Sequence, residues 1–526
     1  MFDHLKLGRR SLLKAIGLTI PALALSPGTG LANHLFGNFF GNPIISENNK
    51  PGTTDWLITN PANNHEIEGY ASWTYIDPGD SIQIFVNTAE PSYQLEVFRL
   101  GWYGGAGGRR MFGPITLDGT QQVIPEPDPK TGLVECAWTN PFTLRTRFDW
   151  TTGVYLAKLT ASQSGKQSYV PFTLRNGGRF SRLLFQNSVT TWQAYNNWGG
   201  RSLYEFNSTN GIRAVKVSFN RPYVLGTGAG DLFAWELSML RFLEREGYDV
   251  SYCTNMTTHR NSSLRNHQAF LSVGHDEYWS AEMRQNVTAI RNRGVHLGFF
   301  GANDCYWQVR IEPSPLSGQP RRTMVCYKDR FQEDPLFGID NAHVTTRWRD
   351  APVSQPEEQL IGVQYEFGPV DTDLVVSNAQ HFIFEGTGLG DGDHLPGLFG
   401  SEADHSFGGG PANLIRLCYS PIILGGASRT ARTRTISTPA GPITIVGEEP
   451  PTGQQQTLTT AENAVTSANI GFSEMTIYTA PSGALVFAAG TFQFNWGLDD
   501  GAESSRTHLV NPAAQRMVRN LFNRFD

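Results

Sequence analysis

Hydrophobic and polar positions alternate in short runs from about residue 65 to residue 176. Ile82, Ile84 and Val86 follow a turn at residues 78–80 and fall on one face of an extended chain. Regular turn residues separate the runs, which favours an antiparallel β-sandwich of the immunoglobulin-like (Ig-like) kind over residues 63–176. Further strands of this region are expected at residues 94–100, 154–159 and 168–174.

From about residue 180 the pattern changes to apolar runs that alternate with helical periodicity. Asp231 is expected to cap a helix that ends at Gly247, and Ser280 a helix over 281–293 that ends at Gly294. This order of strands and helices predicts an α/β domain with a mostly parallel sheet, which we place at residues 177–526. Its buried strands are expected at residues 182–186, 248–253, 269–273 and 295–300.

The last part of the α/β domain shows three further features. Residues 475–479 and 484–488 read as a hairpin, and Asn511 and Pro512 open a final amphipathic helix. Residues 427–466 are rich in Thr, Gly, Gln and Pro and show little periodicity. We therefore expect a surface excursion there and no separate domain.

Composition narrows the class of protein. The chain has 526 residues, 39% of them hydrophobic and 17% charged, which is enough for two or three soluble domains. The net charge of -6 and the absence of a long basic run exclude nucleic acid as the expected partner. Five cysteines without a CxxC pair make no zinc framework, and their odd number leaves at least one thiol unpaired in a monomer.

The first 32 residues have the pattern of a twin-arginine signal peptide. Arg9 and Arg10 precede an apolar stretch at 15–25, and small residues follow at 30–32. The stretch is too short to span a membrane. The sequence therefore predicts export to the periplasm or beyond, with no stable membrane span after the signal is removed. Residues 33–62, rich in Asn, Gly and Pro, are expected to form a linker.

Polar and aromatic residues gather where three of the predicted parallel strands end. These segments are residues 187–200, 274–279 and 301–307, and the second has the sequence GHDEYW. Because right-handed crossovers bring such strand ends to one edge of the sheet, ligands are expected there. Within this edge His275 and Glu277 are candidate functional residues, whereas Asp276 is expected to hold a turn.

Several familiar chemistries have no motif in the chain. There is no GxSxG nucleophile elbow, no HExxH zinc helix and no GxGxxG after a strand. Covalent catalysis is therefore disfavoured. What remains is a hard metal ion with oxygen ligands, or acid and base chemistry by carboxylates.

The motifs of the chain resemble those of the large (beta) subunit of N,N-dimethylformamidase and its C-terminal domain family. The resemblance covers most of residues 65–425 and adds residues 490–497. The matching segments are RLGWYGG at 99–105, residues 188–200, SFNRPY at 218–223, GYDV at 247–250, residues 273–280 and GAN at 301–303.

The resemblance implies an amide hydrolase with one ferric iron ion and a small-molecule substrate. Tyr155, Tyr195 and Glu277 match the two tyrosines and the glutamate that bind the iron in that family. His275 and Asn303 match the nearby histidine and asparagine. The same resemblance makes Glu402 a candidate for holding the leaving amine. A helix cap and a surface carboxylate are alternatives for Glu402.

Two departures and two alternatives stay open. The large subunit of the formamidase has a longer N-terminal portion and a small partner subunit, whereas this chain begins with an export signal. A partner subunit is therefore doubtful, and a homo-oligomer stays open. One alternative is a metal-free hydrolase, such as a glycosidase, that pairs Glu402 with Asp276 or Glu277. The other is a non-catalytic envelope protein that binds polysaccharide, with sugars stacked on Trp192, Trp198, Trp279 and Trp307.

Overall fold

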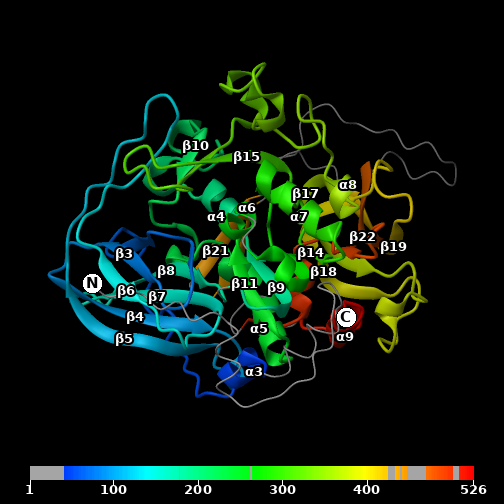
Figure 1. The fold of residues 1–526 in the computed structure, drawn as a ribbon, viewed down its shortest axis with the longest axis horizontal. Coiled ribbons are helices and arrows are strands. Elements are labelled where there is room, and N and C mark those ends of the chain that lie inside the picture. The colour runs from blue at the N-terminus through cyan, green and yellow to red at the C-terminus, as the bar shows by residue number, and fades with distance from the viewer. Residues whose placement is uncertain are drawn as a thin grey trace, which may run out of the picture. The chain divides into compact units, whose positions relative to one another are not determined.

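Two β-sheets built by residues 68–174 share one hydrophobic core. Ile82 and Ile84 of the first sheet and Val97 and Leu159 of the second are fully buried in it. The predicted alternation of Ile82, Ile84 and Val86 is confirmed, because these residues are buried whereas Ser81 and Gln83 are exposed. The three-stranded sheet has the order β1 (Glu68–Ala71), β3 (Ser81–Asn87), β6 (Phe142–Arg145), and the five-stranded sheet β2 (Tyr75–Ile76), β8 (Gln167–Leu174), β7 (Gly153–Ala161), β4 (Ser92–Leu100), β5 (Gly108–Asp118) (Figure 1).

The computed structural model describes residues 41–176, 178–260, 263–424, 433–438, 441–446, 469–501 and 509–525. The expected signal peptide at 1–32 and residues 33–40 of the expected linker lie outside this part. The rest of that linker is packed: Pro43–Asn48 forms helix α3, and the fully buried Trp56 donates its indole hydrogen to the carbonyl of Ala106 over 2.9 Å. The Ig-like topology and the domain boundaries stay predictions.

A seven-stranded mixed sheet forms the centre of the second half. Its first five strands are parallel, as the strand and helix order predicts, the sixth runs antiparallel to the fifth, and the seventh runs antiparallel to the sixth. The late hairpin is confirmed as the antiparallel pair of the sixth and fifth strands. In spatial order the strands are β11 (Val250–Thr254), β9 (Ser181–Asn187), β12 (His267–Val273), β14 (His296–Phe300), β23 (Leu485–Ala488), β22 (Asn469–Thr479) and β19 (Ile415–Leu424).

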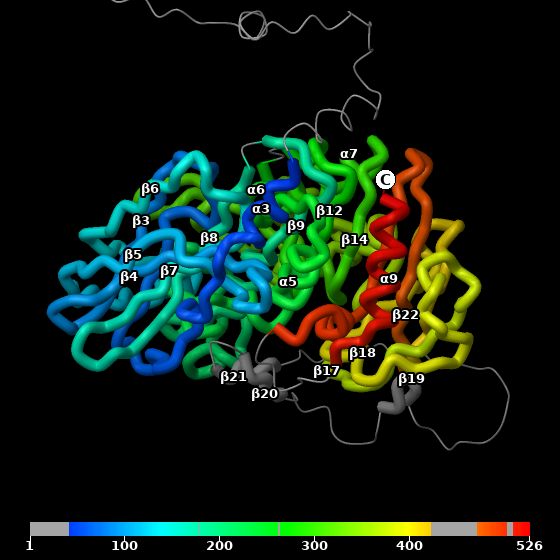
Figure 2. Tube along the Cα trace, turned by 90° about the horizontal axis from the view of Figure 1, so that it is seen from below, coloured from blue at the N-terminus to red at the C-terminus, as the bar shows by residue number. Residues whose placement is uncertain are grey.

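Helices cover both faces of this sheet. The chain passes from β9 to β11 in one direction along the sheet and from β12 to β14 in the other. Because such crossovers are right-handed, α5 (Leu237–Arg245) and α7 (Ala281–Arg291) lie on opposite faces (Figure 2). The last helix, α9 (Pro512–Asn523), lies against β9 and β14, since Arg182 donates to the Phe522 carbonyl and Phe525 stacks on His296.

The helix ends follow the expected capping residues with one exception. Ser280 accepts a hydrogen bond from the Met283 amide at the start of α7, and Asn511 caps α9 in the same way. Gly247, at φ 72°, follows the end of α5. Asp231 makes no side-chain capping bond, because a π-helical turn, η5 (Leu232–Glu236), precedes α5 and changes the hydrogen-bond pattern there.

Three smaller sheets complete the described residues. A long two-stranded hairpin carries Glu402, and a four-stranded sheet lies beside the loop that follows β12. The expected excursion at 427–466 contains a short hairpin, and its remainder lies outside the described residues. These sheets are β17 (Gln364–Val375) with β18 (His394–His405); β10 (Lys216–Ser218), β16 (Thr323–Val325), β15 (Trp307–Glu312) and β13 (Tyr278–Ser280); and β20 (Thr433–Thr438) with β21 (Gly441–Val446).

The remaining helices are short. The α-helices are α4 (Val189–Tyr195), α6 (Asn255–His259) and α8 (Glu358–Ile361), and single turns are η1 (Tyr103–Gly105), η2 (Trp198–Gly200), η3 (Thr209–Gly211), η4 (Leu225–Gly228), η6 (Leu264–Asn266), η7 (Lys328–Glu333), η8 (Asn341–His343), η9 (Phe382–Phe384) and η10 (Gln493–Gly497). In the part of the chain that the structure describes, no helix is both long and apolar enough to cross a bilayer.

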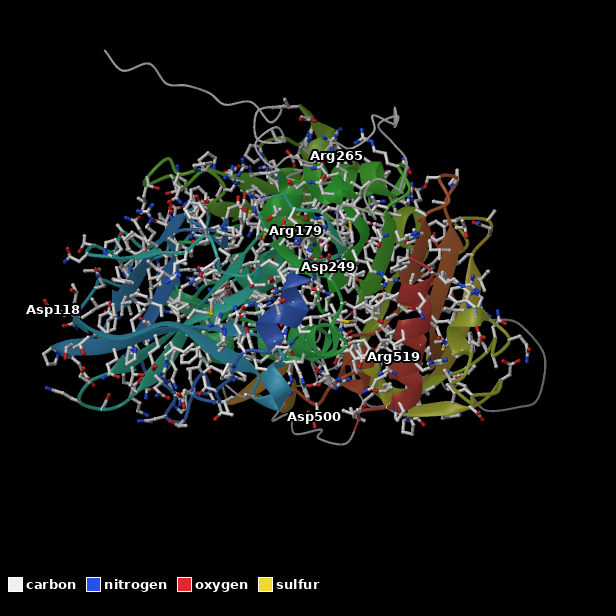
Figure 3. The ribbon with its side chains drawn as sticks, turned by 60° about the horizontal axis from the view of Figure 1, so that its bottom comes forward. Asp118, Arg179, Asp249, Arg265, Asp500 and Arg519 are labelled. Atoms are coloured by element: carbon white, nitrogen blue, oxygen red, sulfur yellow. The ribbon has the colours of Figure 1, made fainter. Side chains whose placement is uncertain are left out.

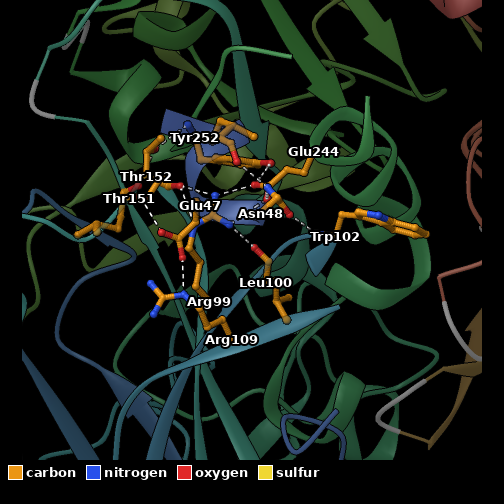
Figure 4. Close-up of polar contacts among 12 residues, drawn as sticks. Glu47, Asn48, Arg99, Leu100, Trp102, Arg109, Thr151, Thr152, Glu244 and Tyr252 are labelled. Atoms are coloured by element: carbon orange, nitrogen blue, oxygen red, sulfur yellow. Dashed lines mark hydrogen bonds and ion pairs between the residues drawn. The ribbon is translucent and has the colours of Figure 1, made fainter. Parts of the chain in front are cut away.

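A buried polar network joins α3, the β4 strand and α5 to the central sheet (Figure 4). We call it the Arg99–Glu244 network. Arg99 donates to the two carboxylate oxygens of Glu244 over 2.9 and 2.7 Å, and both side chains are fully buried. Tyr252 of β11 and Asn48 of α3 donate to the same carboxylate. On the surface nearby, Arg179 pairs with Asp249 where β9 and β11 begin (Figure 3).

The five cysteines all lie in the described part of the chain, and all are buried. None of them forms a disulfide.

Candidate functional site

The candidate site lies where the strand order of the central sheet reverses direction. The crossover from β9 leads to β11 on one side, and that from β12 leads to β14 on the other, so the carboxyl ends of β9 and β12 flank a switch point. Helix α4, which follows β9, ends at Tyr195. The loop that follows β12 carries His275 and Glu277. The predicted meeting of these strand ends is confirmed.

Backbone hydrogen bonds join the loop after β12 to the loop after β14. The Cys305 amide donates to the Asp276 carbonyl over 2.9 Å, and the Tyr306 amide donates to the Glu277 carbonyl over 2.8 Å. A side chain at Gly301 would place its first carbon 2.0 Å from the Gly274 carbonyl oxygen. Only glycine therefore permits this approach, and the two loops form one rigid edge.

The carboxylate of Glu277 lies at the centre of the site. It is fully buried, and the hydroxyls of Tyr195 and Tyr204 each donate to its Oε2 over 3.0 Å. The two tyrosine rings stack with their centroids 4.2 Å apart. The Glu277 amide donates to the Thr191 hydroxyl of α4 over 2.9 Å. These contacts bring the side-chain oxygens of Tyr195, Tyr204 and Glu277, from three segments of the chain, to one point.

A buried lysine lies against the second tyrosine. The ammonium of Lys328 is 3.1 Å from the ring centre of Tyr204 and 5.0 Å from that of Trp307. Its backbone has a φ of 55°, which side-chain-bearing residues rarely adopt. Tyr278 also donates its hydroxyl to that of Tyr204. A cation at this ring face favours negative charge on the Tyr204 oxygen.

His275 lies between two buried glutamates. Its Nε2 is 3.2 Å from Oε2 of Glu277 and 3.5 Å from Oε2 of Glu402. Burial alone would lower the pKa of His275, but the Glu402 and Glu277 carboxylates outweigh it and raise the pKa to about 9. The ring packs on Phe492, with centroids 4.5 Å apart. The two neighbouring acids therefore favour the protonated form of His275.

Glu402 comes from the hairpin and not from the central sheet. It is buried on β18, so neither a helix cap nor a surface carboxylate describes it. The Gly400 amide donates to the Thr491 hydroxyl, which holds β18 to the loop after β23. Burial and the neighbouring Glu277 outweigh the opposing effect of His275 and together raise the pKa of Glu402 to about 8. The carboxyl is thus able to exchange a proton near neutral pH.

Asn303 lies on the loop after β14, next to Glu402 of β18. Its backbone is left-handed, with φ 55°, and its amide donates to Asp404 over 2.8 Å. The buried atoms Asn303 Oδ1 and Glu402 Oε2 accept no hydrogen bond from another described residue. Buried polar atoms are rarely left unsatisfied, so these two indicate a place for a bound molecule or water.

The sequence of this chain matches one family model. Residues 94–508 match the family described as N,N-dimethylformamidase beta subunit-like, C-terminal. The chain belongs to this family. The resemblance drawn from the motifs is thereby confirmed, and the match includes every residue of the site described above.

Other known proteins add little to the family match. No curated protein matches the chain. A solved structure, described as a family 123 glycoside hydrolase from Clostridium perfringens that hydrolyses glycolipid glycans, shares 8% identity, with 49% of this chain and 52% of that chain covered and a TM-score of 0.11. The chain thus spans about half the length of that enzyme, and so distant a likeness carries no argument.

Tyr155, matched to an iron ligand of the dimethylformamidase family, has its contacts elsewhere. Its ring stacks between Trp150 and Phe172 in the sandwich core. Its hydroxyl donates to the Thr151 carbonyl over 2.6 Å, and burial raises its pKa well above the usual value. Alternate residues of a strand share a face, and residue 155 falls on the inner face of β7. These contacts do not support a ligand role for Tyr155.

The roles expected for Asp276 and the tryptophans can be compared with their contacts. The Asp276 carboxylate accepts from Gln186, Asn255 and Ser272 over 2.6 to 2.8 Å, which suits the expected structural role. The polysaccharide-binding alternative needs exposed rings. The rings of the four tryptophans are buried, which counts against polysaccharide binding. Their exposed fractions are 3, 2, 0 and 1% for Trp192, Trp198, Trp279 and Trp307.

Sequence reasoning missed Tyr204 and Lys328, and it included Phe492 only as part of a matching segment without a role in the site. Tyr204 lies in a segment without periodicity, nine positions after Tyr195, and only its contact with Glu277 reveals it. No spacing in the sequence links Lys328 or Phe492 to the strand ends. Among the described residues, no set of three or more His, Cys, Asp and Glu side chains is arranged for a metal ion. Such a set does not include tyrosine, whose oxygen can also bind a metal ion.

Proposed function

We propose that this member of the dimethylformamidase-like family is an exported, metal-dependent hydrolase that cleaves a C–N bond of a small amide. The observation that carries the proposal is the buried Glu277 carboxylate, which accepts from Tyr195 and Tyr204 at one oxygen. Family membership supports a hydrolase. The unsatisfied atoms of Asn303 and Glu402 beside it could accept hydrogen bonds from a polar ligand.

The donor set suits a mononuclear ferric ion. Two oxygens bound at roughly 2 Å to one cation at right angles lie about 3 Å apart, as the tyrosine oxygens do from Glu277 Oε2. Ferric iron is a hard cation that favours oxygen ligands. A cation at this point would lower the pKa of both phenols. Tyr195, Tyr204 and Glu277 would therefore hold the ion, and Tyr204 takes the place first given to Tyr155.

The chain's own residues would divide the remaining work. The bound ion supplies a Lewis acid for the amide carbonyl. His275, held between Glu277 and Glu402, would pass a proton at its Nε2. Asn303 would orient the substrate through its side-chain amide. Water would add to the carbonyl carbon as the C–N bond breaks, and the protonated amine would leave toward Glu402, whose Oε2 has no hydrogen-bond donor among the described residues.

Export and assembly belong to the same proposal. The twin-arginine pattern of residues 1–32 supports export to the periplasm or beyond. An Ig-like sandwich followed by an α/β domain is the architecture we propose for the described sheets. A small partner subunit is not part of the proposal, and a homo-oligomer stays open.

Metal analysis with matched tyrosine variants tests the proposal. We expect about one iron per purified chain, with loss of iron in Tyr204→Phe and Tyr195→Phe. Tyr252→Phe is the matched control, because it removes a hydroxyl that Glu244 accepts in the Arg99–Glu244 network. Hydrolysis of N,N-dimethylformamide and of other small amides is then measured. An iron-free chain that is fully active would refute the metal role.

The same experiment distinguishes the metal-free hydrolase, which uses two carboxyl groups, from the metal-dependent hydrolase. Since His275 Nε2 contacts both glutamates, Glu277 Oε2 and Glu402 Oε2 lie within about 7 Å of each other, inside the spacing of glycosidase carboxyl pairs. Activity on glycosides after complete removal of metal would favour the alternative. Activity on amides that returns only with added iron would favour the metal-dependent hydrolase.

A further inference from the structure

A cleft separate from the Glu277 site opens between the sandwich and the segment that follows β10. Its empty space, open solvent included, is about 460 Å³, and about 30 Å³ of this can hold the centres of water-sized molecules. None of the site residues lines it. Its walls are mainly apolar, and they come from β1, β7, β8, α4 and residues 219–223. The apolar residues of the wall include Ala71, Val170, Phe172, Val189 and Trp192.

The charged side chains that line this cleft are two arginines, and neither has a carboxylate partner. Arg221 and Arg322 are each 1% exposed. No aspartate or glutamate lies in the cleft wall. Within the part of the chain that the structure describes, neither guanidinium forms an ion pair. The cleft therefore carries positive charge between apolar walls.

The two arginines differ in how their donors are used. Arg221 donates to four acceptors, namely Gln193 Oε1 and the carbonyls of Trp198, Arg201 and Asn196. It holds the loop after α4 in place, so we assign it a structural role.

Arg322 keeps part of its guanidinium unused. Its Nε donates to Asn220 Oδ1 over 2.7 Å, and its Nη2 donates to the carbonyls of Ala71 and Phe219. No described residue accepts a hydrogen bond from Nη1. A buried guanidinium with two free N–H donors in a cleft is a ready partner for an anion.

The nearest compensating charge reaches Arg322 only indirectly. Asn220 donates its side-chain amide to Glu135 Oε1 over 2.8 Å, while its oxygen accepts from Arg322. Glu135 therefore offsets part of the charge through Asn220. Burial lowers the pKa of Arg322 to about 10, so the group is still charged at neutral pH. The Nη1 face is left for a ligand.

We propose that this cleft binds a small monocarboxylate with a short apolar chain, whose carboxylate accepts from Nη1 of Arg322. A single planar carboxylate matches the free donors of one guanidinium. Val170, Phe172 and Val189 provide the apolar wall for the chain of the ligand. A phosphate or other strongly hydrated anion would lose its water without enough donors to replace it.

The cleft also touches the helix that ends in the proposed site. Val189 and Trp192 line the cleft, and Tyr195 of the same helix donates to Glu277. Binding in the cleft requires no metal and no hydrolytic activity, so it can be measured independently of the proposed function.

Thermal unfolding of the metal-free chain with butyrate tests the inference. We expect a saturable rise in Tm with sodium butyrate, because a ligand that binds only the folded state stabilises it. Butanamide has the same shape without the charge, and sodium chloride supplies the same ionic strength. Neither should raise Tm. An equal rise with either one overturns the proposal.

Variants of Arg322 locate the site. Arg322→Met should weaken butyrate binding by at least tenfold, and Arg322→Lys should weaken it less. The exposed Arg265 (Figure 3) gives the control Arg265→Met, which removes one positive charge elsewhere and should leave binding unchanged. If Arg322→Met does not fold, Ala71→Val tests the same cleft by narrowing its wall. Unchanged butyrate binding in a folded Arg322 variant, or in Ala71→Val, overturns the assignment.

Discussion

Two buried clusters of the molecule each combine a glutamate with tyrosine hydroxyls, yet their charges are balanced in opposite ways. In the Arg99–Glu244 network, the carboxylate accepts from the two terminal nitrogens of Arg99, from Tyr252 and from Asn48 (Figure 4). One buried cation therefore matches one buried anion, and both carboxylate oxygens are satisfied.

The Glu277 site has more acids than cations. Glu277 accepts from two tyrosines, but Glu402 and Asp404 lie close by, and His275 is the cation that contacts the two glutamates. Burial raises the pKa of Asp404 to about 7. Several buried acceptors lack donors. A fold gains nothing from such a cluster of buried acids, whereas a cation-binding or catalytic site does.

The comparison teaches that composition alone does not separate a structural cluster from a functional one. Glutamate and tyrosine occur in both. What differs is whether the charge is neutralised and every hydrogen bond is made within the chain. Substitutions in the two clusters test whether this difference in charge balance separates stability from function.

Removing the glutamate of the balanced network should cost the most stability. Glu244→Gln leaves Arg99 buried without an anion, which typically destabilises by about 3–5 kcal/mol. Denaturant unfolding measures the loss. The iron content of the folded fraction should not change. A loss below about 1 kcal/mol would mean that the pair is not needed for the fold.

Removing the glutamate of the unbalanced site should affect function and spare the fold. Glu277→Gln takes one negative charge from a group of like charges, so the free energy of unfolding should fall by less than about 1 kcal/mol or rise. Bound iron should be lost, and amide hydrolysis should fall at least roughly 100-fold. Metal analysis and unfolding of the same sample are compared. Large instability with retained iron would reverse the comparison.

Acid should weaken the contacts of Glu47, a buried carboxylate of α3 beside the Arg99–Glu244 network that accepts from Arg109 and Tyr103. Burial alone would raise the pKa of Glu47, but the Arg109 hydrogen bond and nearby Arg99 outweigh it and lower the pKa to about 2 from 4.5. Because the folded pKa is the lower one, this stabilisation is complete above about pH 4.5 and is lost as the pH falls toward 2.

The matching variant is Glu47→Gln. It should be less stable than the parent at pH 6, and the two free energies of unfolding should converge as the pH falls from 4.5 to 2. Parallel curves over that range would show that Glu47 is not the titrating group.

The smallest effect should come from Tyr155→Phe. The change removes the hydroxyl that donates to the Thr151 carbonyl, which costs about 1 kcal/mol. Iron content should stay at the parent level, unlike that of Tyr204→Phe. Loss of iron in Tyr155→Phe would restore Tyr155 as a ligand and displace Tyr204.

Local sequence patterns predicted those strands and helices whose position depends on their own residues. The alternation of Ile82 and Ile84 defines a strand with one buried face, and Ser280 and Asn511 mark helix starts because they bond to the backbone next to them. The β17–β18 hairpin escaped prediction. Its register shifts several times, so its buried positions follow no regular period.

Strand and helix patterns predicted the candidate site only where it follows the sheet, and the family resemblance added Glu402 of the hairpin. Glu277 and His275 come directly after a parallel strand, and the sheet rule points to them. Tyr204 and Lys328 reach the site from segments without periodicity, and tertiary folding alone brings them there. Motif matching placed Tyr155 at the metal, although its position on the inner face of β7 already favoured a place in the core.

The close approach of Gly301 to the Gly274 carbonyl has a consequence for how this scaffold diversifies. Glu277 and Asn303 sit on two loops that are locked together, so neither can be displaced without the other. The β17–β18 hairpin, by contrast, delivers Glu402 from outside the sheet and tolerates irregular register. Relatives with new substrate preferences should therefore keep the locked edge and vary the hairpin, and an engineer who wants a new specificity should begin with the hairpin.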